Sequence, residues 1–524
     1  MNALDREHFW QDRALELLTW SKPWNKACPQ SLEDAAPWFE GGALDVSANC
    51  LDRHIAAGRA DVPALIWQGE PESDVVTMTY AMLQAEVRRA AVVLAGAGVS
   101  KGDVVGVSLP AVPELVVAML ALARLGAVHL VFPAGLAPAV VSGRLSACRA
   151  KLFITGDGYF KAGRPVMVSQ TLDGPRRIVV RRTGQDPDLV RPGDLWWHEA
   201  MEALTTPPDL PGAVHGAEDP LFIIYTSGSS GHPKGVTHCA GGFLAACAHS
   251  ARQAFGVGPG MTMWCQAEPG WIMGHAYSVY APLCLGAATL LYAGSPLYPK
   301  PDRLWRIAQK HQVGAMITTP ALTGQLMREG EAWPAGRDLP ALKLIASVGE
   351  KLTPESRQWL ARSVGKGRAP VVDVWGQTET GGALMVSGGE SGLAPIPGVE
   401  ASTDAQSRLK LDAPWPGLSC SLVEGTLDIR DGAYYTGDLA RTTARGTFEM
   451  LGRAELAGAD LPLAAVEAAV AAQPEVAEAA AVACGDQVLV YATLRAEAAE
   501  SFGMDQTLLE VIRRDVPGEF GCAL

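Results

Sequence analysis

Short, mostly apolar runs alternate with longer segments of helical length through most of this chain. The apolar run Val104–Leu109 precedes the segment Pro113–Leu125, and Val128–Phe132 precedes Ala137–Ala150 in the same way. Apolar runs of this kind are typical of buried strands in parallel sheets, and helices are the usual connections between such strands. The alternation therefore predicts stacked βαβ units with mostly parallel sheets, an α/β fold.

The same alternation continues into the second half of the chain. Further strands are predicted at Leu152–Thr155, Leu221–Tyr225, Met261–Glu268, Ala288–Tyr292, Ala315–Thr318, Leu342–Val348 and Val371–Val374, and further helices at His275–Leu285, Asp302–His311 and Pro354–Val364. Stretches rich in proline and glycine near Pro207–Pro220 and Gly388–Pro397 predict long loops. From about Leu418 to Met450 short strand-like pieces predominate, which indicates a small β subdomain.

Composition narrows the class of protein. With 524 residues the chain is long enough for more than one domain. A net charge of −13 argues against nucleic acid as the main partner, although a local basic site for phosphates stays compatible with it. The ten cysteines form no CxxC pair, which argues against a zinc ribbon and a dense disulfide framework.

The apolar stretches favour a cytoplasmic protein without a membrane segment. The segment Met1–Arg13 is charged and has no apolar signal core. The most apolar stretch, Leu115–Val141, is interrupted by Arg124, Gly126, His129 and Pro133, so it suits buried elements better than a membrane span.

One segment, Tyr225–Val236, carries the strongest chemical signal. It follows the apolar run Leu221–Ile224 and reads YTSGSSGHPKGV, a cluster of hydroxyl residues and glycines that leads to Lys234. Glycines let the backbone approach a polyanion, and exposed N–H groups, hydroxyls and a lysine can hold phosphate oxygens. Pro233 distinguishes it from the common P-loop, which needs glycine before its lysine. The alternative is a solvated Ser/Gly turn.

The segment resembles the signature of the adenylate-forming superfamily, which contains acyl-CoA synthetases, luciferases and peptide-synthetase adenylation domains. The resemblance extends from about Phe9 to about Arg514 and is closest to the acetyl- and propionyl-CoA synthetases. The supporting segments are Trp20–Trp24, Trp38–Gly42, Asn49–His54 and Trp264–His275. It implies a large N-terminal domain, residues 1–452, of two stacked α/β layers and a β subdomain. A small lid domain, residues 453–524, would then rotate about a hinge at Glu455.

The resemblance also implies the ligands. Members of this superfamily activate a carboxylate with ATP and Mg²⁺, and the acyl-CoA synthetases then use coenzyme A. Thr226, Lys234 and Glu379 are the implied catalytic residues, with Glu379 as the Mg²⁺ ligand. The implied ATP-binding residues are Thr226, Ser227, Gly228, Ser229, Ser230, Gly231, Lys234, Gly349, Glu350, Lys351, Asp373, Trp375, Gly376, Gln377, Thr378, Asp438 and Arg453.

Physical chemistry supports parts of this assignment. A carboxylate beside triphosphate oxygens can hold Mg²⁺, a hard cation that prefers oxygen ligands. In Tyr435–Asp438 the aspartate can accept two vicinal hydroxyls, as a ribose requires. In relatives, the tripeptide at Gly349–Lys351 lies against the adenine, and the arginine at Arg453 reaches ribose or phosphate.

The acid and CoA sites follow from the same resemblance. The implied acyl-pocket residues are Trp271, Ile272, Met273, Val348 and Gly376. For Trp271 and Met273, ordinary core packing is the alternative. Acetate-specific relatives have a second tryptophan where this chain has Gly376, so we expect a wider pocket, an acid larger than acetate, and a shift toward acetate in Gly376→Trp. Lys161 and Arg164 match a basic pair that binds CoA phosphates, and a surface charge pair is the alternative.

The lid region departs from the family pattern. Relatives carry Ser-Gly-His-Arg where this chain has Glu455–Pro462, and they end on a lysine motif where this chain has Arg513–Leu524. Because that lysine stabilises the adenylation transition state, we expect slow adenylation by the chain alone. The sequence would then be truncated, helped by a partner protein that supplies the lysine, or a weakened or repurposed member.

These observations favour an AMP-forming carboxylic acid–CoA ligase for a short-to-medium or functionalised acid. The alternatives are a non-catalytic protein that binds ATP or acyl-AMP, and an adenylating enzyme that delivers its acyl group to another acceptor. No nucleic acid or membrane is expected as a partner.

Overall fold

The computed structural model describes residues 2–33, 37–168, 174–184, 191, 193–204, 212–226, 233–388, 392–454, 470, 476–484 and 487–494. The chain forms two compact units: Met1–Ala401 with Asp412–Tyr434, and Ser402–Leu411 with Tyr435–Leu524. The predicted boundary after residue 452 falls inside the last strand of a β meander in the second unit, β26 (Phe448–Arg453). Its role as the start of a lid stays a prediction.

The first unit contains an eight-stranded sheet with the order β10-β9-β6-β4-β5-β12-β13-β23. Its strands from β10 to β12 are parallel, while β13 and β23 are antiparallel to their neighbours. The bounds are β4 (Val104–Ser108), β5 (Val128–Val131), β6 (Leu152–Gly156), β9 (Arg176–Val180), β10 (Leu195–Trp196), β12 (Pro220–Thr226), β13 (Lys234–Cys239) and β23 (Ser421–Leu422).

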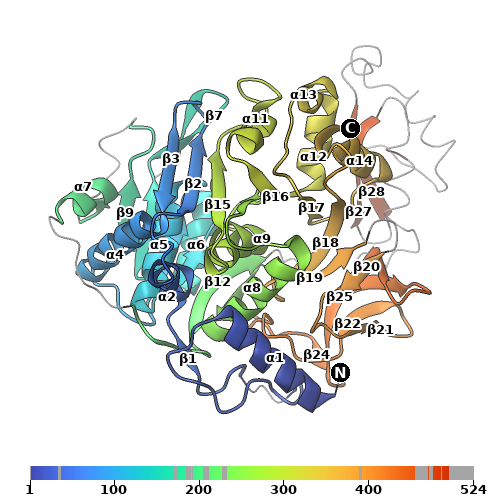
Figure 1. Ribbon diagram of the computed structural model, residues 1–524, viewed down its shortest axis with the longest axis horizontal. Helices are drawn as coiled ribbons and strands as arrows, with labels where there is room; N and C mark the ends of the chain where they lie inside the picture. Colours follow the sequence, from blue (N-terminus) through green and yellow to red (C-terminus); the bar gives the residue numbers. More distant parts are fainter. Residues whose placement is uncertain are drawn as a thin grey trace. The chain divides into compact units, whose positions relative to one another are not determined.

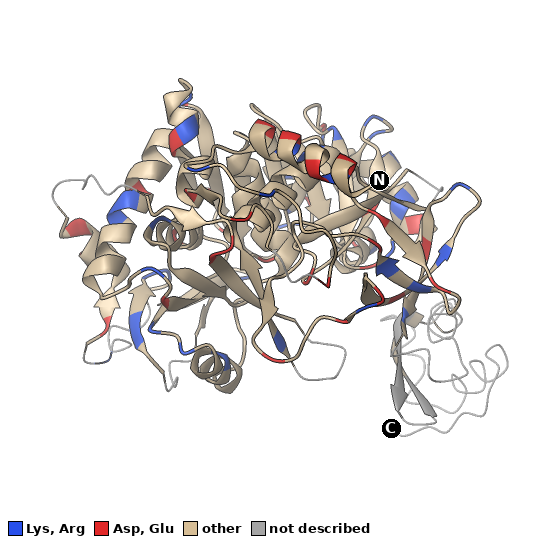
Figure 2. Ribbon diagram, turned by 90° about the horizontal axis from the view of Figure 1, so that it is seen from below, with Lys and Arg blue, Asp and Glu red and all other residues tan. Residues whose placement is uncertain are grey.

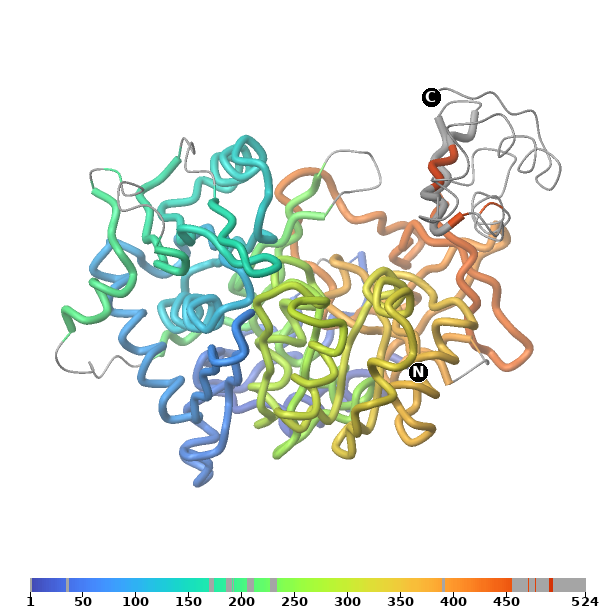
Figure 3. The backbone as a smooth tube through the Cα atoms, turned by 90° about the horizontal axis from the view of Figure 1, so that it is seen from above, coloured from blue at the N-terminus to red at the C-terminus, as the bar shows by residue number. Residues whose placement is uncertain are grey.

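The first unit also contains the strand order β20-β19-β18-β17-β16-β14-β15-β2-β3. The strands from β18 to β2 are parallel, and the strands at both ends are antiparallel. The bounds are β2 (Pro63–Gly69), β3 (Val75–Thr79), β14 (Thr262–Cys265), β15 (Ala288–Ala293), β16 (Val313–Thr318), β17 (Leu344–Val348), β18 (Val371–Gln377), β19 (Gly382–Ser387) and β20 (Leu393–Pro395). Apart from blue β2 and β3, this sheet comes from the yellow-green to orange part of the chain, whereas the first sheet is light blue to green except for orange β23 (Figure 3).

Helices connect the strands and fill the space beside them (Figure 1). α5 follows the predicted bounds because Pro113 suits its first turn and Gly126, with φ 74°, ends it in the left-handed region. α8 packs against β13 of the first sheet and β19 of the second. The bounds are α1 (Ala3–Leu17), α2 (Val46–Cys50), α3 (Asp52–Ala56), α4 (Tyr80–Gly96), α5 (Pro113–Leu125), α6 (Pro138–Ala147), α7 (Trp197–Glu202), α8 (Ala240–Phe255), α9 (Ile272–His275), α10 (Ala281–Cys284), α11 (Arg303–Lys310), α12 (Pro320–Arg328), α13 (Ala332–Ala335) and α14 (Pro354–Trp359).

Two short π-helical turns continue α-helices: η2 (Ala276–Tyr280) joins α9 to α10, and η3 (Leu360–Val364) follows α14. The predicted helix His275–Leu285 therefore begins earlier, at Ile272, and contains the η2 turn. The predicted strand Met261–Glu268 is shorter, because β14 ends at Cys265 and the following residues form a loop. No helix in the described part of the chain is both long and apolar enough to cross a membrane.

The second unit contains β22 (Arg408–Leu411), most of β25 (Ala433–Thr442) and β26, and β25 pairs with β26 antiparallel. It also holds the hairpin of β27 (Val476–Cys484) and β28 (Gln487–Leu494). The remaining short strands are β1 (Ala43–Leu44), β7 (Gly158–Lys161), β8 (Arg164–Met167), β11 (His215–Gly216), β21 (Ala401–Thr403) and β24 (Ile429–Arg430). Basic and acidic residues are interspersed along the described ribbon in the view of Figure 2.

Candidate active site

Thr226 and Lys234 lie opposite each other at the end of the β12–β13 hairpin where its connecting loop begins and ends. The predicted phosphate loop is therefore the connection of a hairpin whose second strand begins at Lys234. Both side chains are half-buried, and no described acidic side chain pairs with Lys234. The loop residues predicted to bind phosphate, Ser227, Gly228, Ser229, Ser230 and Gly231, lie outside the described residues. An uncompensated ammonium group at this place suits an anionic ligand.

Two further predicted segments meet at the carboxyl edge of the second sheet. β17 and β18 are parallel neighbours with Val348 opposite Val374. Gly349–Lys351 leave the sheet directly after this pair, while Trp375–Gln377 continue β18 alongside β19. Gly349 has φ +98°, and a Cβ built there would meet no atom within 4 Å. Glu350 and Lys351 are exposed. The carboxyl edge of parallel strands is where open α/β sheets bind ligands.

Two of the predicted ATP-binding side chains are engaged by the protein itself. The Asp373 carboxylate forms an ion pair with Arg357 and accepts the Leu352 backbone N–H at 3.1 Å. The Gln377 side-chain oxygen accepts a hydrogen bond from the Tyr434 hydroxyl at 3.1 Å. Asp373 therefore holds the turn after Gly349–Lys351, and Gln377 is a buried structural contact in this arrangement.

The turn that carries Thr378 and Glu379 is fixed through its backbone. The Gln377 N–H donates to the Thr380 hydroxyl at 2.9 Å, and the Glu379 carbonyl accepts the Ser419 N–H at 2.8 Å. The Glu379 carboxylate is half-buried and has no hydrogen bond or ion pair to any described residue. A carboxylate in this state is a suitable ligand for a hard cation.

His238 joins the β12–β13 hairpin, called the phosphate hairpin below, to the turn that carries Thr378 and Glu379. The sequence motifs did not identify this residue. Its Nε2 lies 2.8 Å from the Thr378 carbonyl oxygen. Because a carbonyl oxygen only accepts, Nε2 must carry the proton. Burial lowers the pKa of His238 from 6.5 to about 4, which keeps the ring neutral. A histidine on the apolar strand after the loop was the available signal, but its partner lies 140 residues away.

The predicted acyl-pocket residues differ in exposure. Ile272, Met273 and Val348 are buried, whereas the Trp271 side chain is 54% exposed. Met273 is buried among core residues, whereas Trp271, which precedes α9 as its N-cap, is not. The ring is free to form a wall of an open site.

Gly376 lies at a β-bulge between β18 and β19. Trp375 pairs with Met385, but Gly376 pairs with Ala383, so Leu384 is the extra residue. A Cβ at Gly376 would lie 2.0 Å from the Gly382 carbonyl oxygen. Replacing Gly376 by tryptophan would therefore displace β19 and would not simply fill a pocket, so this substitution is a poor test of the expected specificity.

The predicted CoA residues Lys161 and Arg164 face each other across the β7–β8 hairpin. Both side chains are exposed, and neither pairs with a described acidic residue. The buried Glu70 carboxylate holds the hairpin turn, because its oxygens accept the N–H groups of Ala162 at 2.9 Å and Gly163 at 2.7 Å. The arrangement presents two adjacent positive charges on an anchored turn.

In the second unit, Asp438 and Arg453 lie opposite each other on β25 and β26. Arg453 Nε is 3.2 Å from Asp438 Oδ1, and the aspartate is buried while the arginine is largely exposed. The structure thus pairs these two predicted ribose-site residues. The predicted hinge Glu455, the segment to Pro462 and the residues from Arg495 onward lie outside the described residues.

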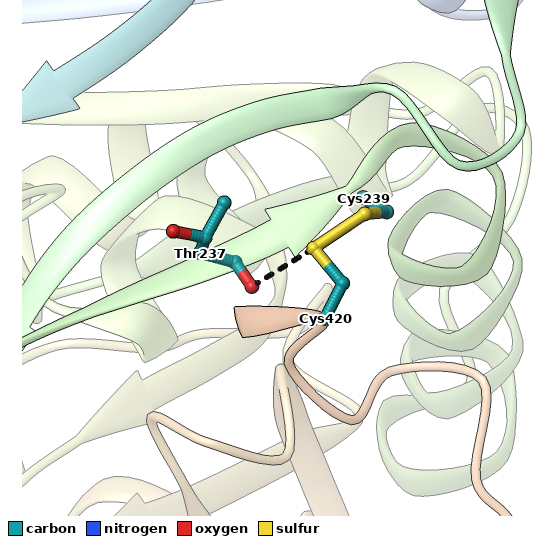
Figure 4. Close-up of a disulfide and its surroundings, with 3 residues drawn as sticks. All are labelled: Thr237, Cys239 and Cys420. Atoms are coloured by element: carbon teal, nitrogen blue, oxygen red, sulfur yellow. Dashed lines mark hydrogen bonds between the residues drawn. A yellow bond between two sulfur atoms is a disulfide. The ribbon is translucent and has the colours of Figure 1, made fainter. Parts of the chain in front are cut away.

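A disulfide joins Cys239 at the end of β13 to Cys420 (Figure 4). The Cys420 N–H donates to the Thr237 carbonyl at 2.9 Å, and the Val423 N–H donates to the Gly235 carbonyl at 2.7 Å. The segment 419–423 therefore contacts both the Glu379 turn and the phosphate hairpin. The free cysteines whose side chains the structure describes are Cys28, Cys50, Cys148, Cys247, Cys265 and Cys284.

Comparison with known proteins gives concordant results. Residues 52–429 match the family described as AMP-binding enzyme, and residues 3–50 match the acetyl-coenzyme A synthetase N-terminus. The chain is similar to acetyl-coenzyme A synthetase of Sodalis glossinidius, with 37% identity over 94% of this chain and 82% of that protein. It is also similar to acetyl-coenzyme A synthetase 1 of Pseudomonas aeruginosa, with 35% identity over 98% of this chain and 86% of that protein.

The fold has a solved counterpart. Acetoacetyl-CoA synthetase from Streptomyces lividans superposes with a TM-score of 0.85 at 23% identity, over 98% of this chain and 83% of that chain. This likeness supports the two-layer α/β architecture predicted from the sequence.

Proposed function

Because this chain belongs to the AMP-binding enzyme family, we propose that it activates a carboxylic acid with ATP and transfers the acyl group to coenzyme A. The single observation that carries the proposal is the hydrogen bond from His238 to Thr378. It ties the hairpin that presents Lys234 to the turn that presents Glu379. A cationic and an anionic side chain are thereby held on connected backbone segments, as binding of a metal triphosphate requires.

In the first step the carboxylate of the acid attacks the α-phosphorus of ATP, and the bond to the pyrophosphate breaks. Lys234 places positive charge on the phosphate oxygens, and Thr226 with the glycines and serines from Ser227 to Gly231 supplies hydroxyl and N–H donors. Thr378 is proposed to contact the α-phosphate. Mg²⁺ bound by Glu379 would neutralise charge on the triphosphate.

The nucleotide's other groups have separate proposed partners. The exposed turn Gly349–Lys351, together with Trp375, would hold the adenine. Asp438 would accept the ribose hydroxyls. Arg453 would give up its ion pair with Asp438 and turn toward ribose or phosphate oxygens. Since Asp373 and Gln377 are engaged within the protein, we assign them to holding these turns in place.

In the second step the CoA thiolate attacks the acyl carbonyl carbon, and AMP leaves. Lys161 and Arg164 are proposed to bind the nucleotide phosphates of CoA. Their support is the anchored hairpin turn and the lack of described acidic partners. Phosphate groups pair well with adjacent cationic side chains.

The proposed acid is larger than acetate. Gly376 supplies no side chain where acetate-specific relatives have tryptophan, while buried Ile272 and Met273 limit length from the other side. We therefore propose a short-to-medium or functionalised acid and a cytoplasmic enzyme. A partner protein that completes the lid stays a prediction without structural support.

Acid-dependent release of pyrophosphate tests the proposal. The purified chain is assayed with ATP, Mg²⁺ and acids from acetate to hexanoate, with and without CoA, and thioester formation is followed in parallel. We expect release that depends on the acid, with propionate or longer acids preferred over acetate. A preference for acetate would refute the proposed specificity. If no acid gives release and calorimetry shows no ATP binding to folded protein, the function itself is wrong.

A further inference from the structure

We propose that Tyr277 is a positioning residue that controls acid specificity by fixing the backbone opposite Gly376. The proposal rests on the proposed function of this site, and it concerns a residue on the η2 turn that is not among the predicted site residues. The Tyr277 side chain is fully buried.

The Tyr277 hydroxyl has a defined place in a hydrogen-bond chain. The Ala383 backbone N–H donates to the Tyr277 Oη at 2.7 Å. Tyr277 Oη and Ser250 Oγ are 2.8 Å apart, and Ser250 donates its own proton to the Cys247 carbonyl at 3.1 Å. The Tyr277 hydroxyl therefore donates to Ser250, and each donor in the chain has one acceptor. Chains of this kind in a low-dielectric interior are rigid and costly to disrupt.

The hydrogen-bond chain through Tyr277 reaches β19 at its bulge. Ala383 is the residue paired with Gly376, and its N–H points to Tyr277. A Cβ on Gly382 would lie 2.6 Å from the Tyr277 Oη, so Tyr277 contacts both residues that face the end of β18. The Tyr277 hydroxyl thus accepts the Ala383 N–H at the bulge, in place of a backbone carbonyl of a neighbouring strand. This bond holds the pairing of β18 with β19 in one register.

The position of β19 determines the space at Gly376. The Gly382 carbonyl oxygen occupies the direction in which any side chain at position 376 would extend, 2.0 Å from an ideal Cβ. In the proposed acyl pocket, the boundary at position 376 is therefore backbone of β19 and not a side chain. A hydroxyl that fixes this backbone fixes the boundary.

A π-helical turn brings the hydroxyl to this place. Tyr277 lies on η2, directly after the acyl-pocket segment Trp271–His275, and π turns inside helices are frequent at functional sites. α8 supplies Ser250 and packs against both η2 and β19, and the labels α8 and β19 stand close together in Figure 1. Three elements therefore converge on one hydroxyl group.

The experiment compares Tyr277→Phe with Tyr280→Phe in the full chain. Tyr280 is an equally buried tyrosine on the same turn, and its hydroxyl bonds His129 at 2.9 Å, away from β19. For each variant, kcat and KM are measured for acids from acetate to hexanoate, with the KM for ATP as a second readout. We expect Tyr277→Phe to change the ratio of kcat/KM between butyrate and acetate by at least about threefold, with the KM for ATP changed less than about twofold.

Tyr280→Phe should leave both readouts within about twofold of the parent. An unchanged acid ratio in Tyr277→Phe, or an equal change in Tyr280→Phe, overturns the proposal.

A double-mutant cycle with Gly376→Ala sharpens the test. Because the added Cβ collides with backbone that Tyr277 holds, its effect on acid preference should be at least about threefold smaller in the Tyr277→Phe background. Independent effects of the two substitutions would contradict the proposal.

A readout without catalysis separates this inference from the proposed function. Hydrogen exchange of the Ala383 amide should be slow in the parent chain, faster in Tyr277→Phe and unchanged in Tyr280→Phe. If no acid supports activity but the amide behaves in this way, the proposed function fails while the positioning of β19 stands. Fast Ala383 exchange in the parent chain would overturn the positioning role itself.

Discussion

The Nε2 of His238 donates to the Thr378 carbonyl oxygen over 2.8 Å, so one buried imidazole connects the phosphate hairpin to the turn that carries Glu379. The ring belongs to β13, four residues after Lys234. Any displacement of the turn relative to the hairpin must therefore break this bond or move both segments together.

Replacing His238 by alanine should weaken ATP binding. The change leaves the Thr378 carbonyl without this donor, and we expect about a tenfold higher KM for ATP, the equivalent of one lost buried hydrogen bond. His238→Gln, whose amide can reach the same oxygen, should retain most of the affinity. The assay is pyrophosphate release against ATP concentration. Equal losses in both variants would mean that ring packing, and not the hydrogen bond, is what matters.

Acid should destabilise the fold before the carboxylates titrate. Burial lowers the pKa of His238 from 6.5 to about 4 and that of His275 from 6.5 to about 3. Since the folded pKa values lie below the unfolded ones, the unfolded chain binds more protons in this window. Their contribution to stability is complete above pH 6.5 and is lost as the pH falls toward 4 for His238 and 3 for His275.

Each of these histidines should contribute about 1.4 kcal/mol per pH unit inside its window. Thermal unfolding between about pH 7.5 and pH 5 measures the effect, because its midpoint should fall with pH. His238→Gln should show a smaller fall over the same range than the parent. A midpoint whose pH dependence is identical in the two proteins would show that His238 is already protonated or unshifted.

Removing the negative charge of Glu379 should abolish most of the metal-dependent chemistry. Glu379→Gln keeps the size of the side chain but removes the anionic ligand, and we expect at least about a hundredfold lower kcat/KM for ATP. Raising the Mg²⁺ concentration should recover only part of the loss. Glu329→Gln is the control, because Glu329 is an exposed glutamate at the end of α12. Near-normal activity of Glu379→Gln would show that Glu379 is not the metal ligand.

The basic pair on the β7–β8 hairpin should act only in the CoA step. Combining Lys161→Ala with Arg164→Ala should raise the KM for CoA about tenfold, since two charge-assisted contacts to phosphate are lost. Acid-dependent pyrophosphate release without CoA should stay unchanged. Lys343→Ala, an exposed lysine directly before β17, serves as the control. An effect on release without CoA would argue that the hairpin serves the nucleotide site or the fold.

Reducing the Cys239–Cys420 disulfide should loosen the segment between the phosphate hairpin and the Glu379 turn. The bond spans 181 residues of sequence, so its loss should lower the free energy of unfolding by about 2–4 kcal/mol. Peptide mapping without reductant should recover the cross-linked pair, and thermal unfolding with and without dithiothreitol measures the loss. In Cys420→Ser the reductant should have no further effect. A reductant-insensitive midpoint in the parent chain would show that the two thiols are not joined.

Local pattern predicted much of the fold. α5 begins at Pro113 and ends at Leu125 as expected, because a proline in the first turn and a glycine after the last are short-range signals. β14 is shorter than expected, because it ends at Cys265. Both ends of the predicted loop Tyr225–Val236 belong to strands, since β12 ends at Thr226 and β13 begins at Lys234. Strand ends depend on which backbone groups find a partner, and pairing with β12 is a long-range event.

The candidate site likewise contains residues that short sequence motifs identified and residues that only the structure revealed. Thr226, Lys234, Glu379 and Gly376 could be named from the chain alone, because short motifs and their order identify the family. His238, Glu70 and Tyr277 could not, because each acts through a residue more than 90 positions away. For Asp373, ATP binding stays a prediction, and the structure adds an ion pair with Arg357 that the sequence did not reveal.

By itself, the sequence determined the α/β class, the order of the elements, and which charged and hydroxyl residues are candidates for binding a nucleotide. These depend on side-chain periodicity, on caps and on motif spacing, all of which act over a few residues. Only the tertiary structure decided which backbone each of those residues faces. It placed the Gly382 carbonyl against Gly376 and the Tyr277 hydroxyl against Ala383. Such contacts join strands and helices distant in the chain, so their geometry exists only once the two sheets and α8 have packed together.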